Sequence, residues 1–230
     1  MIENLISWIL LTLGVVAISA IFAEIYGVEI AIGVFAALTV IANVLAFKIV
    51  NFAIFSVPSA VIIYASTFLM TDIVGERFGK KYARNAVWSG FIANLIYVLA
   101  ATIAVKWEPA PFMSADSVLA FDKVLGFAPR VVFASMVAYL ISQHHDVFAF
   151  HWWKEKTKGK HLWLRNNAST MVSQAIDTTI FITLAFYGSM PLLPMIIGQY
   201  TVKVLIAMID TPFIYAVNFL ADYAVRSAKV

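Results

Sequence analysis

Apolar stretches alternate with short polar loops along most of this chain. A helix crosses a hydrocarbon core of about 30 Å with roughly 20 residues, and each apolar stretch is close to that length. The pattern predicts an all-α integral membrane protein, a polytopic helical bundle with seven spans. The expected spans are residues 5–23, 30–47, 52–71, 86–105, 130–150, 168–187 and 195–220.

The composition favours the same class. Hydrophobic residues make up 62% of the chain and charged residues only 13%, against about 25% charged in soluble domains. The absence of cysteine excludes a disulfide framework and a thiolate metal site. A pI near 9.0 is compatible with nucleic-acid binding, but most basic residues lie in short loops beside apolar spans, as the positive-inside rule requires. We therefore expect the lipid bilayer as a partner, no nucleic acid, and a multi-pass protein of the cell membrane.

Loop charge predicts the orientation. The loops 72–84 and 151–167 and the C-terminal tail hold most of the Lys and Arg, so we place them in the cytoplasm and the N-terminus outside. The less basic loop 106–129 then lies outside. Glu3 precedes the first span without any Lys or Arg, which favours a retained helix over a cleaved signal peptide. The turn 24–29 would be cytoplasmic although it has no basic residue, so the first span is the weakest part of this topology.

The same polar motif, SQxxD, occurs in the middle of two successive spans. It includes Gln143 and Asp146 in the fifth span, and Gln174 and Asp177 in the sixth. Gln and Asp three residues apart share one face of a helix. An ionisable side chain inside a span costs roughly 2.5 to 3.5 kcal/mol on insertion scales, so such residues usually face the bundle interior and mark a pathway or a binding site.

The seventh span adds Lys203 and Asp210, two helical turns apart and on nearly the same face. A purely structural interpretation is that Lys203 neutralises one Asp, either Asp177 or Asp210, while the amides hold helices together. Three intramembrane Asp against one Lys nevertheless leave negative charge without a counter-ion, and that charge must be protonated, solvated or matched by donors of a substrate. The excess favours a binding site.

Motifs of other protein classes are missing. His144 and His145 beside Asp146 do not predict a metal site, because adjacent helical side chains diverge by about 100°. Gly159 and Lys160 are not followed by the Ser or Thr of a Walker A loop, and neither an HExxH motif nor a nucleophile elbow occurs. We expect no cofactor, no metal and no enzymatic activity.

Several motifs in order along the chain resemble one family. They are ANVLAFKIV, TFLMTDIVGERFGKKYAR, SQHHDVFAF, LWLRNNASTMVSQAIDTTIF and KVLIAMIDTPFIY, within residues 39–220. These motifs resemble the queuosine-precursor transporter family, also called the vitamin-uptake-transporter-like family. The resemblance implies a six-helix core that imports 7-cyano-7-deazaguanine and 7-aminomethyl-7-deazaguanine for making the tRNA bases queuosine or archaeosine. It also implies that residues 1–28 are an extra N-terminal helix, 29–222 the six-helix core and 223–230 a short cytoplasmic tail.

The resemblance and the residue chemistry together give the candidate residues. A deazaguanine presents N1 and N2 hydrogens side by side, which a carboxylate accepts in bidentate fashion, while an amide or an ammonium donates to O6. Asp177 with Gln174, or Asp146 with Gln143, supplies this combination. The expected substrate-binding residues are Asn43, Gln143, Asp146, Gln174, Asp177 and Lys203. The expected supporting or coupling residues are Asp72, Glu76, Arg165, Asn166 and Asp210.

Two alternatives stay open at this stage. The chain could be a substrate-binding membrane subunit that depends on a separate ATPase complex, since nothing in it supplies energy. A membrane enzyme acting on lipid or peptide would need a nucleophile and a base that the sequence does not reveal. Whether the protein is a homo-oligomer is also open.

Overall fold

Helices make up most of the fold. The structure, a computed structural model, describes residues 2–46, 48–52, 55–126, 129–188 and 191–227. Its helices are α1 (Ile2–Tyr26), α2 (Glu29–Leu45), α3 (Val61–Arg77), α4 (Lys80–Lys106), α5 (Ala115–Leu125), α6 (Pro129–Lys156), α7 (Leu162–Phe186) and α8 (Leu192–Ser227). The strands β1 (Ile49–Phe52) and β2 (Phe55–Pro58) form one antiparallel hairpin. The predicted all-α class is confirmed, with this hairpin as an unexpected addition.

The lengths and surfaces of the helices fit a membrane environment. Four helical stretches of the described residues are long and apolar enough to cross a membrane: Ile6–Tyr26, Lys80–Lys106, one within 115–156, and Leu192–Tyr223. Large apolar side chains on their outer faces are open to the surroundings, with Leu11, Ile96 and Phe219 exposed by 67%, 62% and 73%. Lipid is the solvent in which such a surface is stable. α2 is apolar but shorter, and α3 and α7 carry the polar residues, so the number of seven spans stays a prediction.

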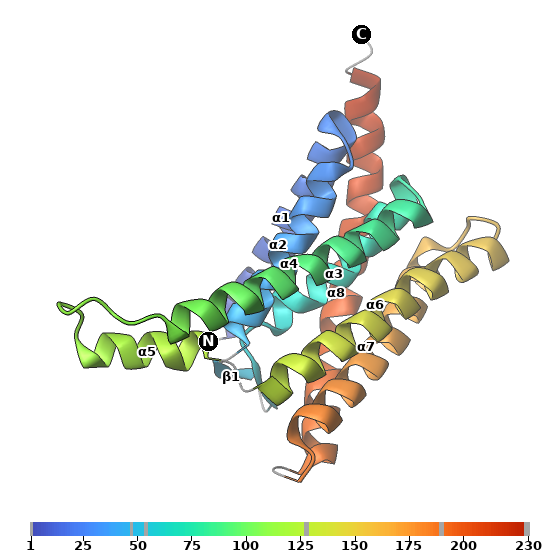
Figure 1. Ribbon diagram of the computed structural model, residues 1–230. Coiled ribbons are helices and arrows are strands. Elements are labelled where there is room, and N and C mark those ends of the chain that lie inside the picture. The colour runs from blue at the N-terminus through green and yellow to red at the C-terminus, as the bar shows by residue number, and fades with distance from the viewer. Residues whose placement is uncertain (1, 47, 53–54, 127–128, 189–190, 228–230) are drawn as a thin grey trace.

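α3 lies at the centre of the bundle. Every residue from Ala65 to Gly75 is buried, and α3 packs against α1, α2, α4, α6, α7 and α8. This burial allows a helix with several hydroxyl and carboxyl groups to lie inside a membrane protein, because these groups contact other helices instead of lipid. α6 and α7 run side by side along their length, joined by a tight turn, while α1, α2 and the second half of α8 gather on another side of the bundle (Figure 1).

The predicted third span is wrong at its start. Residues 52–58 belong mostly to the hairpin, and the helix begins only at Val61 and continues to Arg77. The chain turns back because the Ser59 amide donates to the Lys48 carbonyl (2.8 Å) and the Ser59 hydroxyl donates to the Leu45 carbonyl (2.7 Å). Phe47, the predicted end of the second span, lies outside the described residues.

Other boundaries also differ from the prediction. α8 is longer than its predicted span and continues through Pro212, although proline removes one helical hydrogen bond. The predicted outer loop 106–129 contains α5, which begins at Ala115. Ser114 caps it, because the Ser114 hydroxyl accepts from the Ser117 amide (3.2 Å). α1 buries one face, including Leu13 and Val16, against α2, α3 and α8. The division into residues 1–28, 29–222 and 223–230 stays a prediction.

Candidate functional site

One cavity lies at the end of the bundle opposite the basic turn between α6 and α7. It encloses about 470 Å³ of empty space, its open mouth included, and is lined by the last turns of α2, the start of α3, the first half of α6, the second half of α7 and the start of α8. The polar side chains in its wall are Asn43, Tyr64, Ser135, Asp177, Gln199 and Lys203. A second, smaller cavity shares Asn43, Tyr64 and Ser135 with it and continues toward Phe91 and Asn94 of α4.

Asp177 is the point where four helices meet in this wall. Its Oδ2 accepts from Lys203 Nζ of α8 at 2.6 Å. Its Oδ1 accepts from the Tyr64 hydroxyl of α3 (2.6 Å) and from the Ser142 hydroxyl of α6 (3.1 Å). The Lys203 ammonium also lies 4.9 Å from the centre of the Tyr64 ring, a cation–π distance. Lys203 therefore pairs with Asp177 and not with Asp210, and both members of the pair face a cavity although they are almost fully buried.

Asn43 is the second anchored polar group of the wall. Its amide Nδ2 donates to Asn94 Oδ1 of α4, and its Oδ1 accepts from the Ser135 hydroxyl of α6 at 3.2 Å. Asn94 in turn donates to the Gly90 carbonyl (2.9 Å). These bonds fix the orientation of the Asn43 amide at the cavity by contacts from two other helices.

The first SQxxD copy and Gln174 do not line either cavity. Gln143 Nε2 donates to the Thr67 hydroxyl at 2.9 Å, which ties α6 to α3. Gln174 is fully buried, and neither atom of its amide group has a hydrogen-bond partner. The structure thus brings Asn43, Asp177 and Lys203 of the expected binding residues together and leaves Gln143, Asp146 and Gln174 elsewhere.

Three other carboxyl groups lie deeper in the bundle. Asp72 of α3, Asp146 of α6 and Asp210 of α8 are each at most 1% exposed. Asp72 Oδ2 accepts from the Thr170 hydroxyl (3.2 Å), and Asp210 Oδ1 accepts from Asn166 Nδ2 (3.1 Å), both donors being on α7. Asp146 interacts electrostatically with Asp72 and Asp210, so the three side chains form one group, which we call the aspartate cluster.

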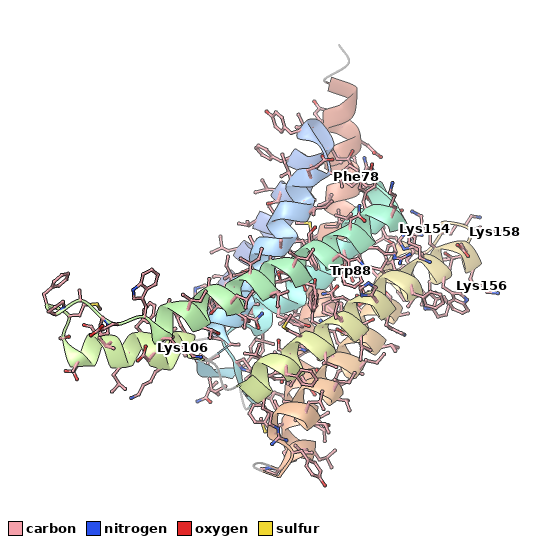
Figure 2. The ribbon with its side chains drawn as sticks, viewed as in Figure 1. Phe78, Trp88, Lys106, Lys154, Lys156 and Lys158 are labelled. Carbon is pink, nitrogen blue, oxygen red and sulfur yellow. The ribbon has the colours of Figure 1, made fainter. Side chains whose placement is uncertain are left out.

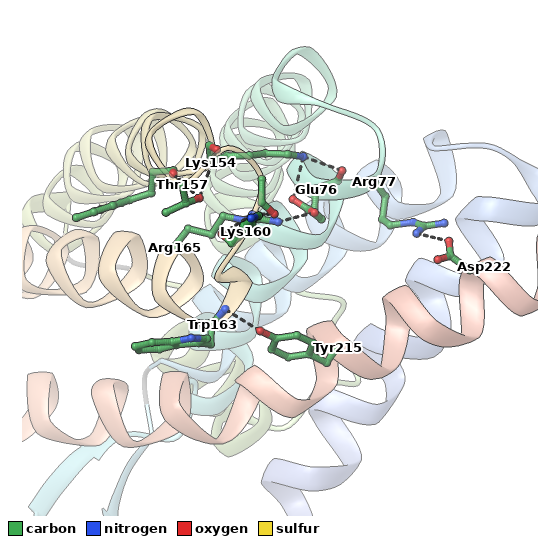
Figure 3. A network of polar contacts seen from close by, with 11 residues as sticks. Glu76, Arg77, Lys154, Thr157, Lys160, Trp163, Arg165, Tyr215 and Asp222 are labelled. Carbon is green, nitrogen blue, oxygen red and sulfur yellow. Dashed lines mark hydrogen bonds and ion pairs between the residues drawn. The ribbon is translucent and has the colours of Figure 1, made fainter.

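Ion pairs close the end of the bundle near the basic turn. Glu76 of α3 pairs with Arg165 of α7 (2.5 Å) and with Lys154 of α6 (2.9 Å) (Figure 3). Arg77 pairs with Glu24 of α1 (2.5 Å) and with Asp222 of α8 (2.7 Å). These bonds connect the end of α3 to α1, α6, α7 and α8.

Arg165 is the buried cation of this closed end. Only 1% of its side chain is exposed, and its guanidinium also donates to the carbonyls of Gly159 (2.8 Å) and Lys160 (3.3 Å) in the turn between α6 and α7. Glu76 and Arg165, expected as supporting residues, therefore lie at the opposite end of the bundle from the cavity, where their ion pair holds the helices together.

The histidines of the first SQxxD copy point to different partners. His144 Nδ1 contacts the Leu140 carbonyl, and His145 Nδ1 contacts the Ser173 hydroxyl, both at 2.9 Å. Within the described ranges, no group of three His, Asp or Glu side chains is disposed to hold a metal ion.

Sequence reasoning missed several residues of the wall. Asn94 interrupts an apolar span and Gln199 precedes Lys203 by one helical turn, so both carried a signal. The sequence did not mark Tyr64 as a site residue, because a tyrosine near the end of a span is usually an interfacial anchor. Ser135 in the wall, and Ser142, which donates to Asp177 without lining the cavity, are single hydroxyls of the kind that occur throughout membrane helices.

Comparison with known proteins places the chain among transporters. Residues 58–217 match the model of the family described as "Putative vitamin uptake transporter". The chain is 34% identical over 195 residues to a "Probable queuosine precursor transporter" of Bacillus subtilis (strain 168), covering 83% of this chain and 84% of the relative. It is 30% identical over 122 residues to a protein of the same name from Haemophilus influenzae, covering 53% and 48% of the two chains. It is 27% identical over 125 residues to the "Queuosine precursor transporter" of Escherichia coli K12, covering 53% and 52%. No solved structure matches the chain.

Proposed function

The chain belongs to the vitamin uptake transporter family, and from this premise we propose that it imports queuosine precursors through the cavity at Asp177 and Lys203. The relatives named above support the substrate class. The observation that carries the site is the buried Asp177–Lys203 ion pair in the wall of a cavity. A buried pair of this kind contributes little net stability, so its place beside a cavity favours a binding role.

The geometry of the pair suits the guanine-like edge of a 7-deazaguanine. An ionised carboxylate offers about four lone-pair sites, and Asp177 uses three of them for Tyr64, Ser142 and Lys203. A substrate that brings two adjacent N–H groups can take the free site and replace one of the hydroxyl donors. The Lys203 ammonium has three protons and donates one to Asp177, so it can also donate to the substrate's O6.

The amides of the wall extend this pattern. Gln199 lies one helical turn from Lys203 and lines the same cavity, so its amide can reach the substituent at position 7 or the ring nitrogens. Asn43 presents a fixed amide on the opposite side, from α2. In this proposal, 7-cyano-7-deazaguanine and 7-aminomethyl-7-deazaguanine bind through the edge that they share, and the substituent at position 7 is contacted separately.

The open end decides from which side of the membrane the cavity can be reached. The cavity lies at the end away from the basic turn of α6 and α7, and the positive-inside rule puts that turn in the cytoplasm. The cytoplasmic end is closed by Glu76, Arg165 and Lys154. An outward-open cavity above a closed inner end is the state in which an importer takes up its substrate.

Uptake by the purified chain in liposomes is the test of this function. We expect saturable uptake of labelled 7-cyano-7-deazaguanine, inhibited by unlabelled 7-aminomethyl-7-deazaguanine and not by adenine, which lacks the guanine-like edge. Asp116→Asn, at an exposed position of α5, serves as a control that keeps uptake. Binding of the deazaguanine without any uptake would instead favour the alternative of a binding subunit that needs a separate ATPase complex, and absence of binding would overturn the proposal.

A further inference from the structure

The aspartate cluster has no cation of its own. The chain's buried cations within the described helices, Lys203 and Arg165, are engaged by Asp177 and Glu76. Asp72, Asp146 and Asp210 interact with one another and are almost fully buried. Neighbouring like charges in a low dielectric repel strongly, and each buried carboxylate also loses its hydration.

The neighbouring hydroxyl groups relieve this charge only in part. Asp146 lies close to Ser169, Thr170 and Ser173, but each of these hydroxyls has only one proton. Ser169 donates its proton to the Asn166 carbonyl, Ser173 donates to the Ser169 carbonyl and Thr170 donates to Asp72. Both oxygens of Asp146 are consequently left without a hydrogen-bond donor.

A second buried side chain at the cluster also has an acceptor atom without a hydrogen-bond donor. Asn166 is fully buried at the cluster, where its Nδ2 donates to Asp210, and its Oδ1 has no donor. Three acceptor atoms on two buried side chains therefore face a shortage of hydrogens. Protons on the carboxyl groups supply those hydrogens and remove the repulsion at once. Among the described residues, no group of three His, Asp or Glu side chains is disposed to hold a metal ion.

The cluster lies between the cavity and the closed cytoplasmic end. Thr170 precedes Asp177 by seven residues on α7, and Asp210 follows Lys203 by seven residues on α8. At a rise of 1.5 Å per residue, each separation is about 10 Å along the helix. The same two helices thus carry the cavity pair at one level and the cluster or its donors at the next level toward the cytoplasm.

We propose that Asp72, Asp146 and Asp210 form a proton-binding site whose occupancy couples substrate uptake to the proton gradient, a role that rests on the proposed import function. In the outward-open state a proton from external water forms an O–H bond to a carboxylate oxygen of the cluster. When the inner end opens, that bond breaks and the proton passes to cytoplasmic water, so the cycle conserves charge and protons.

Other charged groups on the packed helices already have partners, and the proposed protonation does not break these contacts. Glu76, Arg165, Asp177 and Lys203 are ion-paired, and His145 contacts Ser173. The titratable or charged groups nearest in sequence to the cluster residues, or to Thr170 on α7, are Glu76 on α3, His145 on α6, Arg165 and Asp177 on α7, and Lys203 on α8.

An infrared experiment tests proton binding without any substrate. In lipid films of the purified protein at neutral pH, we expect the carbonyl-stretch band of protonated carboxylic acids. The band should shrink in Asp146→Asn, Asp72→Asn or Asp210→Asn and stay unchanged in Asp116→Asn, whose side chain is exposed on α5. A wild-type spectrum without the band, or a band that all three cluster variants leave unchanged, overturns the proton site. Three cluster variants are used because one of them could fail to fold.

A transport experiment tests the coupling. Liposomes with the membrane potential clamped and an external pH one unit below the internal pH should accumulate labelled 7-cyano-7-deazaguanine about tenfold if one proton accompanies each substrate. A protonophore should abolish the accumulation. Asp146→Asn should still exchange labelled for unlabelled substrate but should not accumulate it.

The coupling is overturned if the wild type exchanges substrate and accumulates it to the same level with and without the pH gradient. Accumulation by Asp146→Asn equal to that of the wild type overturns it as well. Failure of the wild type to bind or exchange any deazaguanine is a failure of the proposed import function instead, and the infrared result then still decides whether the cluster binds protons.

Discussion

Asp177 is the residue on which substrate recognition depends in our proposal. Its oxygens are shared among Tyr64, Ser142 and Lys203. A ligand without the exocyclic amine leaves this buried carboxylate one donor short, which costs about 1 to 3 kcal/mol. We expect the wild type to prefer 7-deazaguanine over 7-deazahypoxanthine by about tenfold to a hundredfold as competitors of uptake.

Asp177→Asn should weaken binding and lose this preference, because an amide has one acceptor and two donors where two acceptors are needed. Asp146→Asn is the matched variant, since Asp146 belongs to the first copy of the motif and lies outside the cavity wall. A wild type that treats the two analogues alike would show that no carboxylate reads this edge. Loss of the preference in Asp146→Asn alone would assign the reading to the other SQxxD copy.

The ion pair between Lys203 and Asp177 can be tested with single and double variants. Removing one member of a buried ion pair leaves an uncompensated charge and costs about 3 to 5 kcal/mol. Lys203→Ala should therefore lower the melting temperature of the purified protein more than Lys203→Ala combined with Asp177→Asn. Lys203→Ala with Asp210→Asn is the control and should show no such recovery, because Asp210 bonds to Asn166 and not to Lys203. Equal melting temperatures for the single and both double variants would contradict the pairing.

Gly90 decides how closely α4 approaches α2 and α6. A Cβ at Gly90 would lie 2.5 Å from the Tyr139 hydroxyl oxygen and 2.7 Å from Phe35. The Tyr139 hydroxyl is held by its bond to the Val87 carbonyl (2.7 Å), so it cannot move away without losing that bond. Gly90→Ala should reduce stability by about 1 to 3 kcal/mol, measured by thermal unfolding in detergent. Gly33→Ala, where nothing lies within 4 Å of the added Cβ, should be neutral or stabilising, and equal losses for the two variants would refute the packing argument.

At the scale of elements, the two SQxxD copies show what sequence can and cannot predict. The motif predicted helices with an amide and a carboxylate on one face, and both copies do lie on helices, α6 and α7. These helices run in opposite directions, so the same motif places Asp177 toward the cavity end of the bundle and Asp146 toward the end near the basic turn. The sequence therefore identified both carboxylates but could not assign one to the cavity and the other to the aspartate cluster.

The hairpin before α3 was not predictable from hydropathy. Residues 49–58 are almost as apolar as a span, and a short apolar run does not distinguish a strand from a helix. Contacts between distant segments, such as Tyr64 with Asp177, depend on how α3 is placed against α7, which periodicity within a single helix does not report. The Asp177–Lys203 pair was within reach of sequence reasoning because few buried cations were available as partners.

We propose that the ion pairs at the C-terminal end of α3 keep the neighbouring helices together and so act as a latch that holds this end of the bundle closed. Glu76 neutralises Arg165, whose side chain is 1% exposed, so Glu76→Gln leaves a buried guanidinium without its carboxylate. We expect this variant to favour opening of the cytoplasmic end and hence closure of the outer cavity. In this cysteine-free chain, an Ala46→Cys reporter in the cavity wall should be labelled by impermeant thiol reagents from outside, and less so when combined with Glu76→Gln. Glu155→Gln, which removes an exposed charge of α6, should leave labelling unchanged, and equal labelling in all three backgrounds would exclude the latch.

At the scale of the whole molecule, the charges mark two opposite ends. Lys154, Lys156 and Lys158 lie together at one end of α6, far from Lys106 at the other end of α4 (Figure 2). The positive-inside rule places Lys154, Lys156 and Lys158 in the cytoplasm. The proposal that the cavity opens to the outside depends on this placement. The cavity would face the cytoplasm if the orientation were reversed, and the protein would then release substrate from that state.

Paired cysteine reporters decide the orientation. Lys158→Cys, in the basic turn between α6 and α7, should be protected from impermeant thiol reagents in intact cells and react after the membrane is permeabilised. Phe112→Cys is the matched reporter: Phe112 is 90% exposed, in the segment between α4 and α5 that we place outside, and it should react in intact cells. Because the native chain has no cysteine, each signal comes from one position. Labelling of Lys158→Cys but not of Phe112→Cys in intact cells would reverse the topology, and the cavity at Asp177 would then open to the cytoplasm.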